Sequence, residues 1–300
     1  MIIKLSRLLV LGVVSASLSI VTSCGTKAPE EQKSVDTSSS QQAVEVLDAV
    51  EDLLTKLPRP SEVPNLIAKT GADFQPKLLN PLGNAEKFID NNAKAAFNIG
   101  MYGTDVGYLA VYEKSQEALS TFLVGKKLAD KLGVSAAFDE MMITRIEKNL
   151  GNPDSLIAIT DASIIQSTNI LKNNQQMKEA ALLSTGAFVE GLYITCGLLH
   201  DYPPTGLPKV EQDKILVPLV KAVIDQEEAL ASVINLLKKV NDGDATISSM
   251  IIKLEVAQSI YTKANWAKKM AENKGNLVPT ESDIHDLAVA ISEIRTDFSK

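Results

Sequence analysis

The sequence contains few of the residues that most enzyme and metal sites use. Its 300 residues include only two histidines and two cysteines, and aromatic residues make up 5% of the chain. Two histidines provide few ligands for a histidine-rich metal site, so we expect no metal and no other cofactor. With a single tryptophan, Trp266, carbohydrate binding by ring stacking is also disfavoured.

Signatures of common catalytic and nucleotide sites are absent as well. The chain has no GxSxG, HExxH, CxxC, P-loop or GxGxxG pattern. It carries 30 basic and 37 acidic residues, for a formal net charge of −7. An acidic protein of this kind is poorly suited to nucleic acid or to broad electrostatic attachment to anionic lipid. We therefore expect no nucleic-acid partner, and an enzyme is the least favoured class.

The most distinctive stretch that is present lies at the N-terminus. Lys4 and Arg7 form a basic start, an apolar run covers residues 8–20, and Val-Thr-Ser-Cys-Gly follows over residues 21–25. This order of basic, apolar and small residues is typical of a secretory signal peptide. The uncharged run is about 16 residues long, short of the roughly 20 that a membrane span needs. Cleavage before Cys24 is therefore favoured over a retained transmembrane helix.

A cysteine at the predicted cleavage point resembles the lipobox of bacterial lipoprotein signal peptides. The resemblance implies that Cys24 is lipidated and attaches the protein to a membrane. The sequence departs from the usual pattern, because Val-Thr-Ser stands where Leu-Ala-Gly is more common. Gly25, and not aspartate, follows the cysteine. By resemblance to lipoprotein sorting in Gram-negative bacteria, this favours the outer membrane, with periplasmic and surface-facing orientations both open.

The chain divides into three parts by composition. Residues 1–23 form the predicted signal peptide, and residues 24–40 are a predicted flexible tether with almost no bulky apolar side chains. Residues 41–300 are expected to form a single helical domain, because apolar residues recur there with helical spacing. The predicted helices cover residues 41–56, 62–69, 84–112, 116–132, 135–150, 153–172, 175–199, 210–240, 245–272 and 281–298.

The fold class predicted from these segments is all-α. We find no convincing strand, and short joints between long amphipathic helices favour antiparallel neighbours. The expected architecture is a multi-helix bundle or a stack of antiparallel helical hairpins, with about 8–10 helices. A tetratricopeptide-like array is the alternative, although no fixed repeat period is found. Gly133 and Asn152-Pro153 are expected to mark helix ends, and Pro218 is expected to kink residues 210–240.

Two glycine-bearing apolar helices stand out. In the first, Gly100, Gly103 and Gly107 fall on one face. Each glycine costs up to about 1 kcal/mol in a helix interior relative to alanine. Three such residues predict close approach of another helix backbone. In the second, residues 185–200, Glu190 interrupts an apolar run, so its carboxylate must be exposed, paired or protonated.

These two helices provide the candidate site. Our hypothesis is that Asp105 and Glu190 face each other in a pocket for a polar ligand. The structural alternative is that each carboxylate accepts a hydrogen bond from a tyrosine or pairs with a lysine and only orients core helices. We favour the structural alternative. The tyrosines expected to edge the pocket are Tyr102, Tyr108 and Tyr193.

The remaining reactive side chains have ordinary structural interpretations. Cys196 lies in an apolar stretch and is expected to be a small buried side chain without a disulfide partner, since Cys24 carries the lipid. His200 is expected to end a helix, where a cation is favoured by the helix dipole. His285 is expected to be an exposed residue in the first turn of the last helix.

Residues 79–88, 98–108 and 188–193 resemble segments of uncharacterised all-helical lipoproteins of Gram-negative envelopes. That resemblance implies no activity. The predicted function is that of a lipid-anchored envelope lipoprotein which binds another protein or scaffolds a complex without catalysis. The alternative is a helical ligand-binding lipoprotein with a polar pocket around Asp105 and Glu190. An enzyme that uses these two carboxylates is less favoured.

Overall fold

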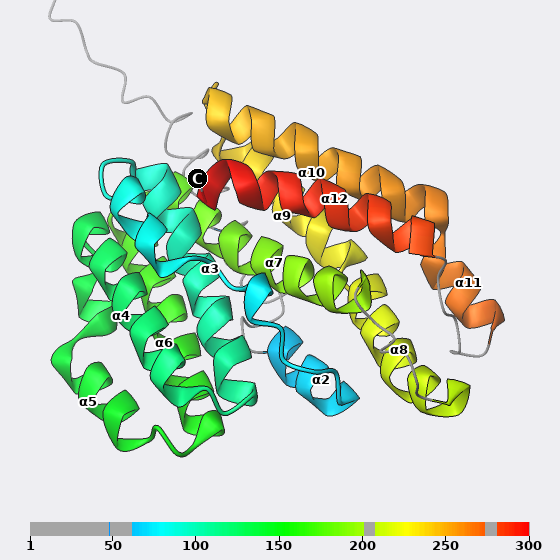
Figure 1. Ribbon diagram of the computed structural model, residues 1–300. Helices are drawn as coiled ribbons and strands as arrows, with labels where there is room; N and C mark the ends of the chain where they lie inside the picture. The colour runs from blue at the N-terminus through cyan, green and yellow to red at the C-terminus, as the bar shows by residue number, and fades with distance from the viewer. Residues whose placement is uncertain (1–47, 49–61, 201–207, 274–280, 300) are drawn as a thin grey trace, which may run out of the picture. The chain divides into compact units, whose positions relative to one another are not determined.

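The computed structural model describes residue 48 and residues 62–200, 208–273 and 281–299, which all belong to one compact unit, residues 38–300 (Figure 1). The predicted signal peptide, the tether and Cys24 lie outside the described residues. Of the helix predicted over residues 41–56, only Asp48 is described, and it is helical.

The described residues contain helices and turns but no strand, which confirms the all-α prediction. Long helices pack together with many contacts between segments distant in sequence, as in a multi-helix bundle. The elements before residue 150 are α2 (Glu62–Thr70), η1 (Pro76–Leu78), η2 (Leu82–Phe88), α3 (Asn92–Val111), α4 (Ser115–Leu132), η3 (Ser135–Phe138) and α5 (Glu140–Lys148). The later elements are α6 (Pro153–Asn173), α7 (Met177–His200), α8 (Lys209–Ile224), α9 (Glu227–Val240), α10 (Ala245–Ala264), α11 (Trp266–Glu272) and α12 (Glu281–Ser299).

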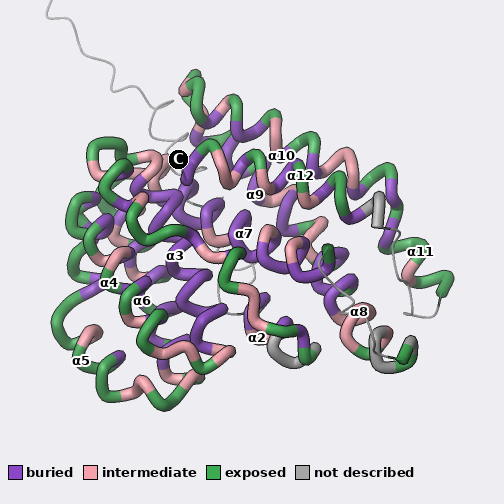
Figure 2. The backbone as a smooth tube through the Cα atoms, in the orientation of Figure 1, coloured by how far each residue is buried: buried purple, intermediate pink, exposed green. Residues whose placement is uncertain are grey.

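Helices α3 and α7 form the centre of this unit. They pack against each other more extensively than any other pair of elements, and every residue of α3 from Ala95 to Ala110 is buried. Helices α4 and α6 cover α3, whereas α9 and α12 pack on α7 and α10 packs on both of them. Figure 2 shows the resulting burial, with the tube of α3 and α7 almost continuously purple. The two central helices are those singled out for their glycines.

Helix α7 is long and apolar enough to cross a membrane, judged by length and composition alone, with a mean hydropathy of 1.5. Within the described residues no other helix meets that criterion. However, 83% of its most apolar window is buried inside the protein. The hydrophobicity of α7 is therefore explained by its place in the core.

Several predicted helix ends are confirmed. Gly133 adopts a left-handed conformation with φ of 80° and ends α4. The side chain of Asn152 accepts a hydrogen bond from the backbone N–H of Ser155, and Pro153 occupies the first turn of α6.

The joints differ more from the prediction than the helices do. Residues 135–150 form η3 and α5 instead of one helix, because Asp139 is extended and its side chain caps α5 at Met142 N. Residues 245–272 form α10 and α11, separated by Asn265 with φ of 49°. Residues 84–112 form η2 and then α3, which begins after Asn91 as its N-cap.

Residues 210–240 also break in a different place from the one predicted. Pro218 lies inside α8, and the interruption falls at Asp225 and Gln226, before α9 begins. Proline removes one backbone donor, and here the helix continues past it for several residues. Apolar residues with helical spacing nevertheless face the core along both helices, with Leu216 half-buried and the others buried: Val220, Val223, Leu230, Ile234 and Leu237.

Candidate functional site

The site begins at the crossing of α3 and α7, where two glycines let the backbones touch. A Cβ atom added at Gly100 would lie 2.0 Å from the carbonyl oxygen of Leu183, and one added at Gly186 would lie 2.0 Å from that of Phe97. The predicted close backbone approach is confirmed at Gly100. At Gly103 the neighbour is instead the side chain of Ile164 from α6, 2.7 Å from the added atom. The crossing brings the middle of α3 beside Glu190, one turn beyond Gly186.

Glu190 is fully buried and forms an ion pair with Arg295 of α12, 105 residues further along the chain. The guanidinium donates through Nε to Oε2 at 2.8 Å and through one terminal nitrogen to Oε1 at 3.0 Å. The same nitrogen donates to the carbonyl oxygen of Leu78 at 3.0 Å. A bidentate pair of this kind fixes the relative position of two helices as well as neutralising both charges. Glu190 is thus paired, but with an arginine and not with the tyrosine or lysine that we expected.

The electrostatics of Arg295 follow from this partnership. Burial by itself disfavours the charged guanidinium, but the charge of Glu190 and its hydrogen bonds outweigh that cost and raise the pKa of Arg295. The guanidinium carbon also lies 4.1 Å from the centroid of the Tyr193 ring, which adds a cation–π contact. Arg295 therefore connects Glu190 in the interior to Tyr193 near the surface.

Asp105 is 1% exposed and is held by one residue of the segment before α3. Its Oδ2 atom accepts hydrogen bonds from the backbone N–H of Asn80 at 3.1 Å and from the Asn80 side-chain amide at 3.0 Å. Within the described residues, Oδ1 has no hydrogen-bond partner. Burial, and then the charge of Glu190, raise the pKa of Asp105 well above its usual range, against the opposing effects of Arg295 and Asn80. Asp105 and Glu190 therefore belong to one buried electrostatic cluster.

Two of the three predicted tyrosines, Tyr102 and Tyr108, bond to backbone and not to the two carboxylates. The Tyr102 hydroxyl donates to the carbonyl oxygen of Pro81 at 3.1 Å, and the Tyr108 hydroxyl accepts from Gln75 N at 2.9 Å. Burial raises the pKa of Tyr108 to about 12, so its hydroxyl stays protonated at neutral pH. These bonds tie residues 75–81 to α3. Of the five residues proposed for the pocket, four lie inside the molecule: Tyr102, Asp105, Tyr108 and Glu190.

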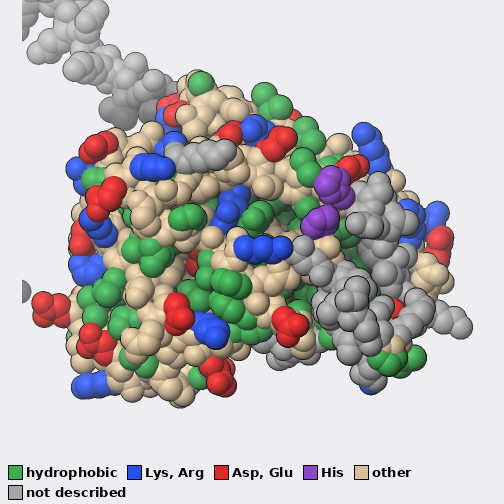
Figure 3. All heavy atoms as spheres, in the orientation of Figure 1, with side chains coloured by type: hydrophobic (Ala, Val, Ile, Leu, Met, Phe, Trp, Pro, Cys, Tyr) green, Lys and Arg blue, Asp and Glu red, His purple; other side chains and the backbone are tan. Residues whose placement is uncertain are grey.

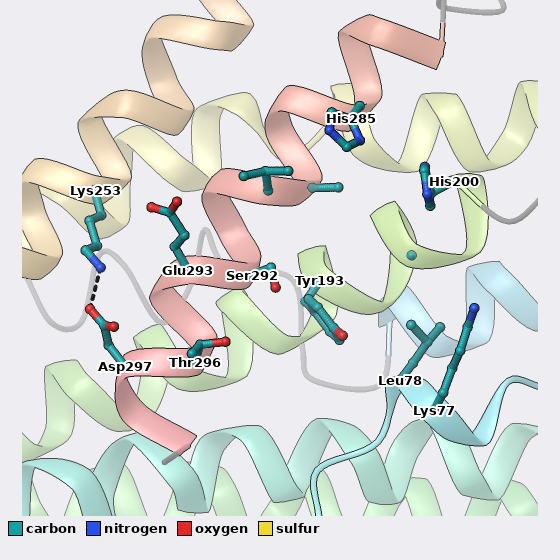
Figure 4. A pocket seen from close by; sticks show the side chains of 13 residues that line it. Lys77, Leu78, Tyr193, His200, Lys253, His285, Ser292, Glu293, Thr296 and Asp297 are labelled. Carbon is teal, nitrogen blue, oxygen red and sulfur yellow. Dashed lines mark hydrogen bonds and ion pairs between the residues drawn. The ribbon is translucent and has the colours of Figure 1, made fainter.

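The fifth residue, Tyr193, lines a pocket of about 650 Å³ between α7 and α12 (Figure 4). Gly197 and His200 line the same pocket from α7, which matches the face that Glu190, Tyr193, Gly197 and His200 share on the helix. Lys77 and Leu78 contribute from η1, and Lys253 contributes from α10. The pocket therefore lies on the surface side of the buried cluster, with Arg295 and Tyr193 between them.

The two histidines meet at this pocket although they are distant in sequence. His200 ends α7 and His285 lies in the first part of α12, and their ring centroids are 5.8 Å apart. Both are exposed, which confirms the prediction for His285, and Figure 3 shows the two histidines side by side on the surface. Within the described residues, no group of three or more His, Cys, Asp or Glu side chains is placed to hold a metal ion. The histidines are therefore candidates for ligand contact and not for a metal centre.

Cys196 lies on α7 but takes no part in the pocket. It is fully buried, as predicted, and forms no disulfide with any residue that the structure describes. Burial raises the pKa of its thiol to about 12, so the nucleophilic thiolate is scarce at neutral pH. Its role is that of a small apolar core residue.

Sequence reasoning missed Arg295, although a signal for it was present. Arg295 lies one helical turn after the buried Ile291, on the face of α12 that carries its regularly spaced apolar residues. An arginine on a buried face requires an anionic partner, and Glu190 was the carboxylate that lacked one. No comparable signal identifies Asn80 or Lys77, because both lie in the irregular segment between α2 and α3.

No protein-family model, no curated protein and no solved structure matches the chain. Its function is therefore argued from the geometry of the pocket and of the buried cluster beneath it.

Proposed function

We propose that this protein is a lipid-anchored, non-catalytic binding protein of a bacterial envelope, and that the pocket between α7 and α12 is its binding site. The observation that carries the proposal is the pocket itself. Its volume of about 650 Å³ falls within the roughly 300–1,000 Å³ that is usual for small-molecule sites. Its walls come mainly from two long helices, and sites built on helices hold their geometry better than sites built on loops.

The buried cluster supports this role by fixing the walls of the pocket. The Glu190–Arg295 ion pair joins α7 to α12, and Arg295 stacks on Tyr193, which lines the pocket. Arg295 also bonds to the backbone of Leu78, another lining residue. One guanidinium thus positions three sides of the pocket, which reduces the ordering cost when a ligand binds.

The same contacts argue against acid–base catalysis by the two carboxylates. A catalytic acid or base must reach the proton that it transfers. Both oxygens of Glu190 already accept hydrogen bonds from Arg295, and Asp105 does not line the pocket. These contacts favour a structural use of both carboxylates and hence binding over catalysis.

A protein-scaffolding role is the second candidate. Ile252 and Val256 lie one turn apart on α10 and are 63% and 51% exposed, which is unusual for large apolar side chains. The other exposed large apolar residues of the described chain are spread over separate elements: Leu82, Leu123, Met141, Ile165, Val210 and Val289. Because these residues form no broad apolar patch on the described part of the chain, the pocket is the better-supported binding surface.

The binding role can be tested by filling the pocket. Ser292 lines it from α12, and the variant Ser292→Trp should place an indole in the space that a ligand needs. A matched control is Ser120→Trp, at an exposed position of α4. After incubation with a small-molecule extract of the cell envelope, native mass spectrometry should detect a bound species on wild type and on the control only. The proposal fails if Ser292→Trp, folded by circular dichroism, retains the same species.

The membrane attachment rests on the sequence around Cys24 and has its own test. Cys24→Ala should move the protein from the membrane fraction to the soluble fraction, because the lipid would have no attachment point. The measurement is fractionation of cells followed by immunoblotting, with Cys196→Ala as the control that should stay in the membrane fraction. Wild-type membrane association of Cys24→Ala would contradict the anchor.

A further inference from the structure

The pocket between α7 and α12 changes character along its length. The two helices run antiparallel beside it, because Tyr193 lies against Arg295 at one end and His200 lies against His285 at the other. Apolar groups line the half next to the two histidine rings: Leu78, Gly197, Ala288 and Val289. Hydroxyl groups line the half toward the end of α12: Tyr193, Ser292 and Thr296. A ligand that complements both halves is therefore apolar at one end and forms hydrogen bonds at the other.

The hydroxyl groups of Ser292 and Thr296 are available to a ligand. The buried serines and threonines of α3, α4, α6 and α7 instead donate to the carbonyl oxygen four residues earlier: Thr104, Thr121, Thr160, Ser163, Ser167, Thr168, Ser184, Thr185 and Thr195. Within the described residues, Ser292 and Thr296 make no such bond, although both are half-buried. Figure 4 shows their oxygen atoms on the side of α12 that faces Tyr193. Each hydroxyl can therefore both donate to and accept from a ligand.

The charged groups around the pocket favour an uncharged ligand. Asp297 is paired with Lys253, and Lys77 makes an interaction of its own. No lysine that lines the described pocket is thus left without a partner to attract an anion. Glu293 is exposed, so water already solvates its carboxylate, and Figure 4 shows it on the side of α12 nearer to Lys253. A charged group in the half lined by hydroxyls would lose hydration without gaining an ion pair.

The dimensions of the pocket limit the size of the ligand. His285 and Thr296 are eleven residues apart on α12, so at 1.5 Å per residue the two ends are separated by about 16 Å. A bare sugar or a short alcohol would leave the apolar half uncovered. A lipid with two long acyl chains is too large for a volume of about 650 Å³. One chain of medium length with a small head group fits both limits.

We infer that this pocket binds a neutral single-chain amphiphile whose small head group carries two neighbouring hydroxyls, as in a monoacylglycerol. The head bonds to the hydroxyls of Tyr193, Ser292 and Thr296. The chain lies over Leu78 and Val289, and it covers a valine side chain that is otherwise 44% exposed. The inference rests on the proposed function, since it names the ligand class of that same site.

Calorimetric titration with four eight-carbon compounds tests the head group, at concentrations below those at which they aggregate. The compounds are 1-monooctanoylglycerol, methyl octanoate, octanoate and octylamine. We expect 1-monooctanoylglycerol to bind most tightly. Methyl octanoate keeps the chain and the ester but lacks the two hydroxyls. It should bind about 25-fold more weakly, because each lost hydrogen bond costs about fivefold in affinity.

Two variants assign the head group to its place in the pocket. Ser292→Ala and Thr296→Val each remove one hydroxyl with little change in shape. Each should weaken binding of 1-monooctanoylglycerol by about fivefold and leave methyl octanoate unaffected. The matched control is Ser120→Ala, at an exposed position of α4, which should bind all four compounds as wild type does.

Several results would overturn the inference. They are the absence of binding for all four compounds, equal binding of 1-monooctanoylglycerol and methyl octanoate, and tighter binding of octanoate or octylamine. Unchanged binding of 1-monooctanoylglycerol to both variants would also contradict it, because the hydroxyls would then not recognise the head. The outcome for the proposed function stays separate: loss of the envelope-derived species in Ser292→Trp would leave that function standing even if no octanoyl compound binds.

Discussion

Helix α7 makes two contacts of opposite character. Against α3 it leaves no room for a methyl group, because added Cβ atoms at Gly100 and Gly186 would meet backbone carbonyl oxygens at 2.0 Å. Against α12 it leaves a pocket of about 650 Å³. Glu190 lies between the two contacts and is bonded to Arg295. The same helix therefore crosses α3 at backbone contact and packs on α12 with a pocket left beside the contact.

The difference shows how a sequence can build a pocket between packed helices. Glycines permit close approach of α3 and α7, whereas α12 is joined to α7 through the long side chain of Arg295. At Gly197, within the pocket, an added Cβ would meet Leu78 Cδ2 at 2.5 Å. The glycine there makes room for η1, which forms part of the pocket wall.

The largest expected effect comes from breaking the ion pair between Glu190 and Arg295, which joins α7 to α12. Glu190→Leu leaves Arg295 buried without its partner and should cost about 3–5 kcal/mol of unfolding free energy. The double variant Glu190→Leu, Arg295→Met should recover most of that loss, because no charge is left buried. Urea unfolding followed by circular dichroism measures both. A double variant as unstable as the single one would show that the pair is not the cause.

The next largest effect concerns the close crossing of α3 and α7. Gly186→Ala forces a methyl group onto the carbonyl oxygen of Phe97, which is backbone and cannot move alone. We expect a loss of about 1–3 kcal/mol. Gly103→Ala meets only the Ile164 side chain and should cost less. Gly83→Ala, with nothing within 4 Å of the added atom, is the control. Equal unfolding midpoints for all three variants would contradict the close crossing.

The smallest effect is a pH dependence in the buried cluster. The raised pKa of Asp105 means that the folded protein binds its proton more tightly than the unfolded chain does. That contribution is complete below the unfolded value, near pH 4, and is lost as pH rises toward the folded pKa, with a slope of up to about 1.4 kcal/mol per unit. Stability of wild type relative to Asp105→Asn should therefore fall as pH rises above 4. A constant difference would show that Asp105 is ionised in the fold.

The helices of this protein were largely predictable, and their joints were not. Apolar spacing identified the buried faces of α9 and α12, because a period of 3.6 residues reports directly on which face is covered. The breaks at Asp139, Asp225 and Asn265 were missed. Aspartate and asparagine also occur on exposed helix faces. A residue that caps a helix therefore differs from a surface residue only in its backbone conformation, which tertiary packing imposes.

The site was predictable in part for a related reason. Asp105 and Glu190 could be identified as candidates because burying a carboxylate in an apolar helix costs free energy. The structure does bring the two residues into one cluster. Their partners, Asn80 and Arg295, come from segments 25 and 105 residues away. Local spacing cannot specify such pairings. The pocket itself arises from four segments that meet only in the folded chain, and Tyr193 was its one predicted member.

The most direct test of the pocket uses the two histidines, since the chain has no others. In an untagged protein their ring resonances report on one place, the end of the pocket where His200 and His285 meet. Addition of increasing amounts of the small-molecule extract of the cell envelope should shift both resonances together in wild type and shift neither in Ser292→Trp. If the extract leaves both wild-type resonances unmoved, or shifts them equally in the filled variant, the pocket is not the binding site.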